Sequence, residues 1–300
     1  MGPPRLMNRA EDAFRADIVE VGRRMYARGY VASNDGNISI RLDDNTILTT
    51  PKSVSKGFMT PDMMVVVDTD GKKIRGTRDA SSELLMHLEV YKNRPDARAV
   101  VHAHPPIATG FAVAGIPLDR AVLAEVVTTL GSVPIAEYGT PSTPELPAAV
   151  RKYIKAHDGL LLANHGALTV GSDVYAAYYK METIEHFAKI SLVTRQLGRE
   201  NLLSRDEVTR LQQLRGSYGI KSPAPICTDG SAAEDLSACQ TIEAPASRAR
   251  RVLTDPGDFH PSEVAALGAP DLDGEIRLSY RELSALIEDA VKALLGGQHG

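Results

Sequence analysis

The sequence predicts a three-layer α/β domain followed by a C-terminal extension. Short runs of apolar and β-branched residues bounded by turn residues, typical of strands, occur at residues 37–41, 46–50 and 64–68. Apolar residues recur at helical spacing over residues 8–28, before these runs, and a second helix is expected after them. Strands and helices follow one another without a regular strand–helix–strand repeat. The pattern therefore indicates a mixed α/β domain that ends near Ile220.

Each predicted element has a start or stop signal. Gly29 ends the first helix, and Ser81 opens a second helix that runs to about Lys92. The later elements are a strand at residues 99–104 ended by Pro105, a buried strand at 160–163, another strand, a long helix at about 172–197 and a helix beginning near Asp206. The α/β domain is assigned to residues 1–222.

The composition excludes several classes of protein. The chain has 300 residues, a net charge of −4 and a pI near 6.1, so nothing supplies the broad positive field that nucleic-acid binding requires. Its longest apolar runs fall far short of the roughly 20 residues that cross a bilayer. The N-terminus lacks the apolar stretch of a secretory signal, and only two cysteines occur. We therefore expect a reduced, cytoplasmic protein with no membrane partner.

The amino-acid composition of the sequence changes after Pro223. Residues 223–275 are rich in Pro, Ala, Ser, Asp and Gly and predict a flexible linker. Residues 276–297 predict an amphipathic helix, because Ser279 and Glu282 form a capping box and an apolar stripe follows, made of Leu283, Leu286, Ile287, Ala290 and Leu294. This helix is not basic, which argues against a membrane-surface role.

Three histidines are candidates for one metal site. His102 and His104 are two residues apart in a predicted strand, so their side chains share one face at the rim where the strand ends. His165 follows another buried strand, and Gly166 beside it permits close backbone approach. Two polar residues at a strand end would be the alternative for the first pair alone. Three neutral imidazoles and an open position are typical of a catalytic zinc site.

Ser81, Ser82 and Glu83 stand at the predicted start of a helix. An ordinary N-cap would explain them. The free N–H groups and partial positive charge of a helix N-terminus, beside two hydroxyls, also suit a phosphate group. Glu83 would lie at the mouth of that site and could take a proton from a carbon acid near a metal. His87, one turn further along, is a candidate to support Glu83.

Two polar loops could add phosphate donors. Asn37 ends the loop at residues 33–37, and Lys52 and Ser53 lie in a turn directly after a strand. Each loop is also explained as an ordinary turn, so neither alone justifies the assignment.

In their order and spacing these segments resemble the class II aldolase/adducin family, most closely its fuculose-phosphate aldolase branch. The resemblance covers residues 8–222 and rests on five motifs: Gly36-Asn37-Ile-Ser39, Thr50-Pro51, Ser81-Ser82-Glu83, His102-Ala-His104 and Asn164-His165-Gly166. It implies a central, mainly antiparallel sheet between helical layers, and a C4-symmetric tetramer with sites at subunit interfaces.

The resemblance also implies residue roles. Zn²⁺, or another divalent metal, would be bound by His102, His104 and His165, with Glu83 as a ligand at rest and as the acid/base in turnover. The substrate phosphate would be held by a polar group of residues, namely Asn37, Lys52, Ser53, Ser81 and Ser82. Tyr218 resembles a C-terminal tyrosine of this branch that reaches a neighbouring subunit's site. The implied activity is cleavage of a (deoxy)ketose 1-phosphate, such as L-fuculose 1-phosphate, into dihydroxyacetone phosphate and a small aldehyde such as L-lactaldehyde.

The sequence departs from the family pattern in places. The second tyrosine of the branch has no counterpart, since Leu123 stands at its position with Glu125 close by, and Lys52-Ser53 replaces the usual Thr-Gly. A sugar-phosphate 4-epimerase or a decarboxylase of the same family is the first alternative. A non-catalytic, adducin-like interaction module is the second, and the retained histidines argue against it.

The C-terminal extension lies outside the family pattern. A linker followed by a short capped helix resembles the encapsulation peptides that load enzymes into bacterial microcompartments. The alternative is a helix that docks on its own domain or on a neighbouring subunit.

Overall fold

The structure is a computed structural model that describes residues 5–217 and residue 220. The linker predicted over residues 223–275, the helix predicted over 276–297 and Tyr218 lie outside the described residues.

A single eight-stranded sheet forms the centre of the domain, with the strand order β4-β3-β2-β1-β5-β8-β7-β6. Every pairing is antiparallel except that of β6 with β7. The strands are β1 (Asn37–Arg41), β2 (Thr46–Thr49), β3 (Val65–Asp68), β4 (Lys73–Arg75), β5 (Ala99–Ala103), β6 (Ile135–Ala136), β7 (Gly159–Leu162) and β8 (Gly166–Gly171). The expectation of a mainly antiparallel sheet is confirmed.

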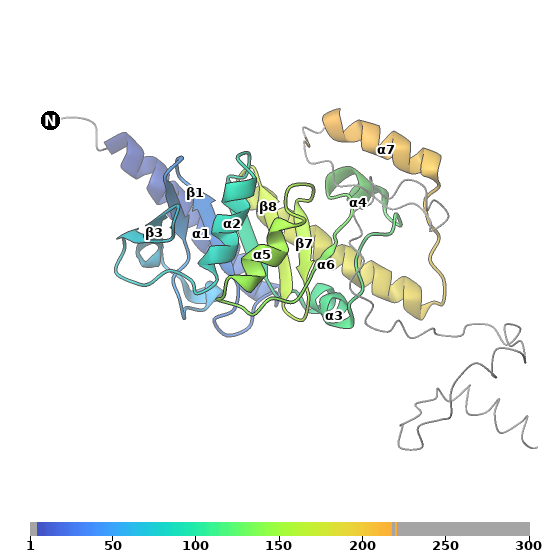
Figure 1. Ribbon diagram of the computed structural model, residues 1–300, viewed down its shortest axis with the longest axis horizontal. Helices are drawn as coiled ribbons and strands as arrows, with labels where there is room; N and C mark the ends of the chain where they lie inside the picture. Colours follow the sequence, from blue (N-terminus) through green and yellow to red (C-terminus); the bar gives the residue numbers. More distant parts are fainter. Residues whose placement is uncertain (1–4, 218–219, 221–300) are drawn as a thin grey trace, which may run out of the picture. The chain divides into compact units, whose positions relative to one another are not determined.

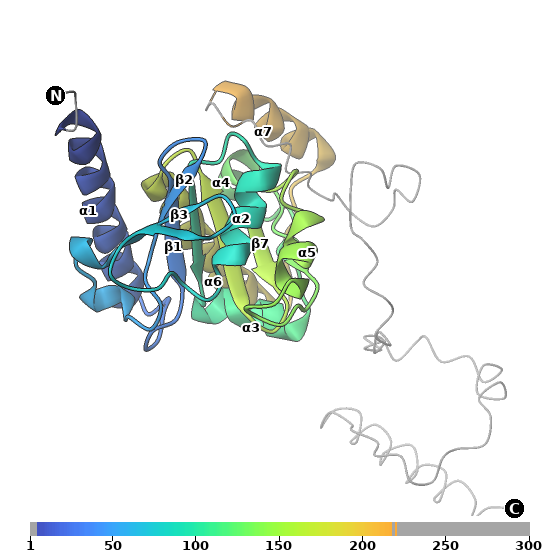
Figure 2. The same cartoon turned by 60° about the vertical axis from the view of Figure 1, so that its left-hand side comes forward.

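Helices cover both faces of this sheet (Figures 1 and 2). One face is packed by α1 (Arg5–Ala27), α3 (Pro106–Ala114) and α6 (Val174–Gln196), and the other by α2 (Leu84–Asn93) and α5 (Glu145–Arg151). The short helices α4 (Ala124–Thr129) and α7 (Arg205–Ser217) pack on each other around a small separate cluster. Two 3₁₀ turns, Lys56–Phe58 and Pro61–Met63, pack against α1. The three-layer prediction is therefore confirmed.

Strand β1 shows how the sheet divides the two cores. Ile38 and Ile40 belong to the core on the α1 and α6 side. Successive side chains of a strand point to opposite faces, so Asn37, Ser39 and Arg41 point toward α2. Asn37 and Ser39 are buried polar residues on that face, and they require partners from the helix that covers them.

The prediction for the start of α2 needs a correction. The helix begins at Leu84 with Glu83 as its N-cap, and no side chain caps it. Ser81 and Ser82 lie in the turn before the helix, because the backbone N–H of Ser81 donates to the carbonyl of Thr50 at the end of β2. This bond keeps the serine pair beside the neighbouring loop.

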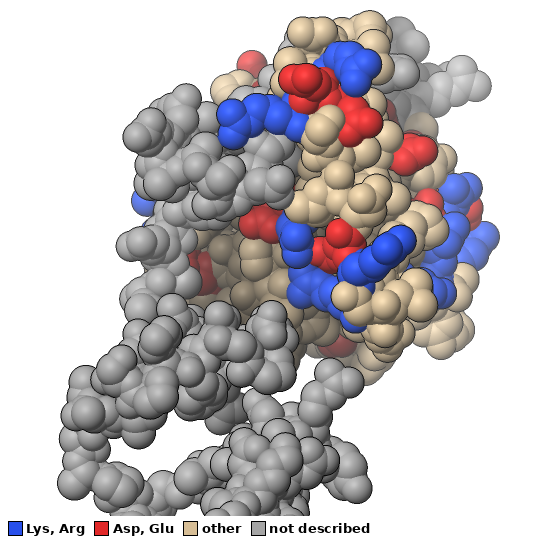
Figure 3. Space-filling view, turned by 90° about the vertical axis from the view of Figure 1, so that its right-hand side faces the viewer, with Lys and Arg blue, Asp and Glu red and all other residues tan. Residues whose placement is uncertain are grey.

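Charged side chains are mixed on the surface. On the face shown in Figure 3, Lys and Arg lie interspersed with Asp and Glu. No helix in the described part of the chain has the length and apolar character needed to span a bilayer.

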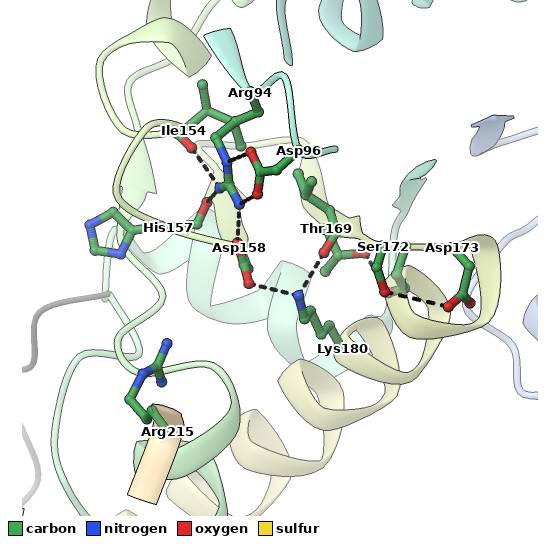
Figure 4. Close-up of polar contacts among 12 residues, drawn as sticks. Arg94, Asp96, Ile154, His157, Asp158, Thr169, Ser172, Asp173, Lys180 and Arg215 are labelled. Carbon is green, nitrogen blue, oxygen red and sulfur yellow. Dashed lines mark hydrogen bonds and ion pairs between the residues drawn. The ribbon is translucent and has the colours of Figure 1, made fainter. Parts of the chain in front are cut away.

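A network of buried ion pairs connects the C-terminal end of α2 to α6, in the helix layer on the other face of the sheet (Figure 4). The guanidinium of Arg94 lies 2.8 Å from carboxylate oxygens of both Asp96 and Asp158. The ammonium of Lys180, on α6, lies 2.7 Å from the second oxygen of Asp158. Asp158 stands directly before β7 and its side chain is 6% exposed, so both of its oxygens are paired inside the protein.

Candidate active site

The three predicted histidines converge at one edge of the sheet. His102 lies in β5, His104 follows the strand and His165 lies in the turn between β7 and β8. Their ring centroids are 4.7–5.1 Å apart, and one nitrogen from each ring lies within 4.8 Å of the others. His102 is fully buried, whereas His104 and His165 are partly open toward solvent.

The partners of these rings fix where their protons lie. Nδ1 of His102 is 2.9 Å from the carbonyl oxygen of Ala167, which can only accept, so Nδ1 carries the proton. Nδ1 of His104 lies 3.4 Å from a carboxylate oxygen of Asp35, which favours the same tautomer. The two Nε2 atoms are 3.1 Å apart, and each then presents a lone pair to the other. A cation bound between the two nitrogens would relieve this repulsion.

Burial keeps the rings of His102 and His104 neutral. Removal from water lowers the pKa of His102 to about 3, with only partial compensation from Glu83. The pKa of His104 is also lowered, first by burial and then by the nearby ring of His165. Neutral imidazoles are the form that binds a metal.

Gly166 makes the convergence possible. A Cβ atom at this position would lie 2.5 Å from the carbonyl oxygen of Ala103 and 2.6 Å from Cδ2 of His104. The left-handed backbone conformation of this turn is found at Asn164, with φ of 54°. Gly166 thus serves close approach, and Asn164 makes the turn.

Glu83 faces the histidines from the N-cap of α2. Its carboxylate oxygens lie 3.0 Å from Nε2 of His165 and 3.4 Å from Nε2 of His102, and the amide of Asn37 donates to it at 2.8 Å. Burial would raise the pKa of Glu83, yet the rings of His102 and His165 and the Asn37 amide hold it well below its usual range. The carboxylate is therefore charged at neutral pH.

These groups fit a divalent cation. A tetrahedral zinc ion with Zn–N bonds of about 2.0–2.1 Å needs nitrogens roughly 3.3 Å apart, close to the 3.1 Å between the Nε2 atoms of His102 and His104. Nε2 of His165 faces the same space, 3.0 Å from a carboxylate oxygen of Glu83. Three imidazole nitrogens and one carboxylate are a donor set that a zinc ion accepts.

A cavity of about 240 Å³ opens beside the histidines. Its lining contains eight of the predicted site residues: Asn37, Lys52, Ser53, Ser81, Ser82, Glu83, His104 and His165. Ser53 adopts a left-handed conformation with φ of 59°, in a turn whose Lys52 N–H donates to the carbonyl of Asp79. Hydroxyls, an amide and two lysines thus line one polar space next to the histidines.

Two residues of this site, Asp35 and Lys56, carry no signal in the sequence. Asp35 contacts His104, although the polar loop around it gave no sign of that role. Lys56 lines the cavity while only 2% exposed, and its ammonium donates to the carbonyls of Asn34 and Val54 at 3.0 and 2.7 Å. Burial lowers its pKa to about 8, against the opposing charges of Asp35 and Glu83. No sequence signal marks a lysine as buried.

Other predicted positions lie elsewhere. Leu123 and Glu125 line a different cavity of about 1010 Å³ beside α6, and neither lines the cavity next to the histidines. Tyr218 lies outside the described residues, so the structure does not place it.

Comparisons with known proteins identify a family for this chain. Residues 16–192 match the family model of the class II aldolase and adducin N-terminal domain. A 3-oxo-tetronate 4-phosphate decarboxylase of Pectobacterium atrosepticum is 31% identical over 67% of this chain and 94% of its own length. An L-fuculose phosphate aldolase of Methanococcus maripaludis is 34% identical over 60% of this chain and 97% of its own length.

A solved structure supports the same assignment. The putative aldolase/epimerase/decarboxylase from Klebsiella pneumoniae superposes with a TM-score of 0.63 at 29% identity, over 67% of this chain and 98% of that one. The family match, the relatives and the shared fold lead to one conclusion: the chain belongs to the class II aldolase and adducin family and is one of its metal-dependent lyases.

Proposed function

We propose that the chain is a zinc-dependent aldolase that cleaves a (deoxy)ketose 1-phosphate, such as L-fuculose 1-phosphate, into dihydroxyacetone phosphate and a small aldehyde such as L-lactaldehyde. The observation that carries this proposal is the position of Glu83. Its charged carboxylate lies between three converging imidazoles on one side and a cavity lined by hydroxyls and lysines on the other. A phosphate in that cavity brings the adjacent carbons of its sugar beside Glu83.

The cavity supplies the contacts that a phosphate dianion needs. Ser53, Ser81 and Ser82 offer hydroxyl donors, and Lys52 and Lys56 offer positive charge. The amide of Asn37 has two N–H donors, of which one is directed at Glu83. The second remains for the ligand. Binding energy from the phosphate, remote from the reacting carbons, can orient the substrate for reaction.

Glu83 then moves the proton. When bound, a divalent cation at the histidines polarises the substrate carbonyl and stabilises negative charge on its oxygen. In the condensation direction, the carboxylate of Glu83 takes a proton from the carbon next to that carbonyl, and this carbon forms the new bond to the aldehyde. In cleavage, the hydroxyl on the departing half loses its proton, the carbon–carbon bond breaks and this half leaves as the aldehyde. Glu83 then gives a proton to the carbon left behind, so the overall reaction moves one proton from that hydroxyl to that carbon. General acid–base catalysis of this kind contributes about 10²–10⁴-fold in rate.

A second candidate is decarboxylation of a 3-oxo acid phosphate. The observation in its favour is the 31% identity to a 3-oxo-tetronate 4-phosphate decarboxylase along nearly all of that relative's length. Both reactions place negative charge on a carbon beside a carbonyl and then protonate it, so the same carboxylate and metal ligands serve either one. The reactions differ in the leaving group, which is an aldehyde in one case and carbon dioxide in the other.

A substrate panel separates the two. The purified protein, with Zn²⁺ and with chelator, would be incubated with fuculose 1-phosphate, rhamnulose 1-phosphate, 5-deoxyribulose 1-phosphate and 3-oxo-tetronate 4-phosphate. We expect release of dihydroxyacetone phosphate from at least one of the three ketose phosphates, abolished by chelator. Carbon dioxide released from the 3-oxo acid, with no dihydroxyacetone phosphate from the other three, would favour the decarboxylase.

We also propose a homotetramer with sites at subunit interfaces, and a targeting role for residues 276–297. The tetramer is the assembly that the family resemblance implies. The two relatives match 67% and 60% of this chain over nearly their full length, so about a third of the chain or more has no counterpart in them, and the family match ends at residue 192.

Light scattering tests the tetramer. Deletion of residues 276–300 tests the targeting role, because it should leave the specific activity intact and abolish co-purification with microcompartment shell proteins. Unchanged co-purification would contradict it.

A further inference from the structure

A buried polar trio lies between β1 and α2, outside the cavity. The hydroxyl of Ser39 is 2.7 Å from Nδ1 of His87 and 2.8 Å from the hydroxyl of Tyr91. Their exposed fractions are 0%, 1% and 6%. A polar group buried this deeply is stable only with partners, so the trio fixes how these side chains sit. The proposed mechanism uses none of them.

The trio belongs to two facing rows of side chains, one on β1 and one on α2. We call the two rows the polar ladder, and each contact between them a rung. Asn37, Ser39 and Arg41 follow one face of β1 at intervals of two residues, and Glu83, His87 and Tyr91 follow one face of α2 at intervals of four. Two strand residues advance about 6.6 Å and four helix residues about 6.0 Å, so the two rows stay in step.

Each rung joins the strand to the helix through polar contacts. Asn37 donates to Glu83 at 2.8 Å on the first rung, and Ser39 meets His87 at 2.7 Å on the second. On the third rung, the guanidinium of Arg41 lies 4.8 Å from the centre of the Tyr91 ring and donates to the Tyr91 carbonyl.

The position of Glu83 depends on this docking. Glu83 is the N-cap, outside the regular helix, with φ of −102° and ψ of 14°. Its carboxylate reaches His102 and His165 only because the first turn of α2 lies against the start of β1. Apolar residues of α2, among them Leu84, Leu88 and Val90, also pack in the core on this face of the sheet. Apolar contacts are non-directional, so the polar rungs set the register.

We propose that His87 is a positioning residue that acts through Glu83: its bond to Ser39 holds α2 in the register that aims the Glu83 carboxylate at the histidines. This inference rests on the proposed function only for the proton-moving role of Glu83. The neutral ring suits the task, since burial lowers the pKa of His87 to about 4 and leaves Nδ1 able to bond a hydroxyl.

A double-mutant cycle tests the inference. His87→Leu keeps a similar volume and removes the polar rung, whereas His87→Asn restores a polar atom near the position of Nδ1. His87→Leu should lower kcat about 10–100-fold with little change in KM, as loss of a supporting contact does in metal sites. His87→Asn should recover most of this loss. In the Glu83→Gln background, His87→Leu should not lower kcat any further, because the effects of two substitutions are not additive when one residue acts through the other.

His157→Leu is the matched control. His157 is another buried histidine, 3% exposed and bonded to the carbonyl of Ser132, far from the ladder in the sequence. This variant should lower the melting temperature and leave kcat unchanged. Equal losses of kcat in His87→Leu and His157→Leu, or additive losses in the cycle, would overturn the inference.

A measurement on the metal-free protein separates this inference from the proposed function. Imidazole ¹⁵N signals of His102 and His165 report the nearby carboxylate, so Glu83→Gln should shift them. His87→Leu should shift them in the same direction and His87→Asn should not. A wild-type protein inactive on every substrate would refute the proposed function, and these signals would still decide the role of His87. Unshifted signals in His87→Leu would overturn that role.

Discussion

Asn37 and His102 are register partners across β1 and β5, so the amide that holds Glu83 and the buried histidine lie side by side on one face of the sheet. Directly opposed residues of an antiparallel pair have Cβ atoms about 4.5–5.5 Å apart. The strand register itself therefore sets part of the site. His165 and Glu83 are added from a turn and a helix start that pack on the same edge.

Replacing the carboxylate of Glu83 should remove the proton transfer and leave the metal in place. We expect Glu83→Gln to lower kcat by about 10²–10⁴-fold, because an amide cannot accept the proton. Metal content should remain near that of the wild type, since three histidines stay. Steady-state kinetics with elemental analysis measures both. A kcat within a few-fold of the wild type would exclude Glu83 as the base.

Gly166→Ala should damage the metal site. The new Cβ would meet the carbonyl of Ala103 and the ring of His104 at 2.5 and 2.6 Å, so backbone or ring must shift. We expect a loss of about 1–3 kcal/mol in stability and a weaker metal affinity. Gly110→Ala, in α3, is the control, because a Cβ there has no neighbour within 4 Å among the described residues and alanine favours a helix. Equal metal affinity in both variants would contradict the steric account.

Lys56→Met should weaken binding of the phosphate. Hydrogen bonds to a charged group are worth about 1.5–3 kcal/mol, so we expect KM to rise roughly 10–100-fold with a smaller change in kcat. Inhibition by inorganic phosphate should weaken in parallel. Lys92→Met, at an exposed position on α2, is the control and should leave KM unchanged. A similar KM in the two variants would remove Lys56 from the anion site.

Asp158 predicts an acid-dependent loss of stability. Burial would raise its pKa, but Lys180 and Arg94 lower it below the ordinary value. As the pH falls, the Asp158 carboxylate of the unfolded chain binds a proton near pH 3.9, and that of the folded protein binds one only at a lower pH. The contribution of Asp158 to the stability of the fold is therefore fully present above about pH 3.9. It is lost as the pH falls through the lower pKa of the folded state.

Asp158→Asn measures this contribution. Breaking a buried ion pair costs about 3–5 kcal/mol, so the free energy of unfolding of the variant in urea should be lower than that of the wild type by this amount at pH 7. The difference between the two proteins should become smaller below about pH 4. Asp96→Asn removes a half-exposed partner of the same Arg94 and should cost less than about 1 kcal/mol. A difference in the free energy of unfolding between the wild type and Asp158→Asn that stays constant from pH 7 to pH 3 would contradict this role of Asp158.

Local patterns in the sequence predicted much of the fold. The run at residues 37–41 matches β1 residue for residue, and Ile18, Val21 and Met25 of the first helix are fully buried, as their spacing predicted. The i, i+2 spacing of His102 and His104 also placed both rings on one face. These features depend only on how often a side chain of a helix or a strand returns to the same face.

Other features depend on contacts that no local pattern reports. Strand β4 is exposed along its length and β6 has two residues, so neither shows a burial period. Lys56 is buried with its ammonium bound by the carbonyl of Val54, two residues away, and by that of Asn34, which belongs to a separate loop. Asp35 joins the site because its loop folds back beside His104, and the start of α2 was misplaced because Ser81 bonds to Thr50.

Metal content is the most direct measurement of the central claim. The account predicts that the wild-type protein, expressed with zinc and purified without chelator, holds close to one zinc ion per chain. Single replacements of His102, His104 and His165 by alanine should each lower this occupancy sharply while circular dichroism shows the fold retained. His157→Ala should keep the metal. Occupancy in the three site variants equal to that of the wild type would contradict the account.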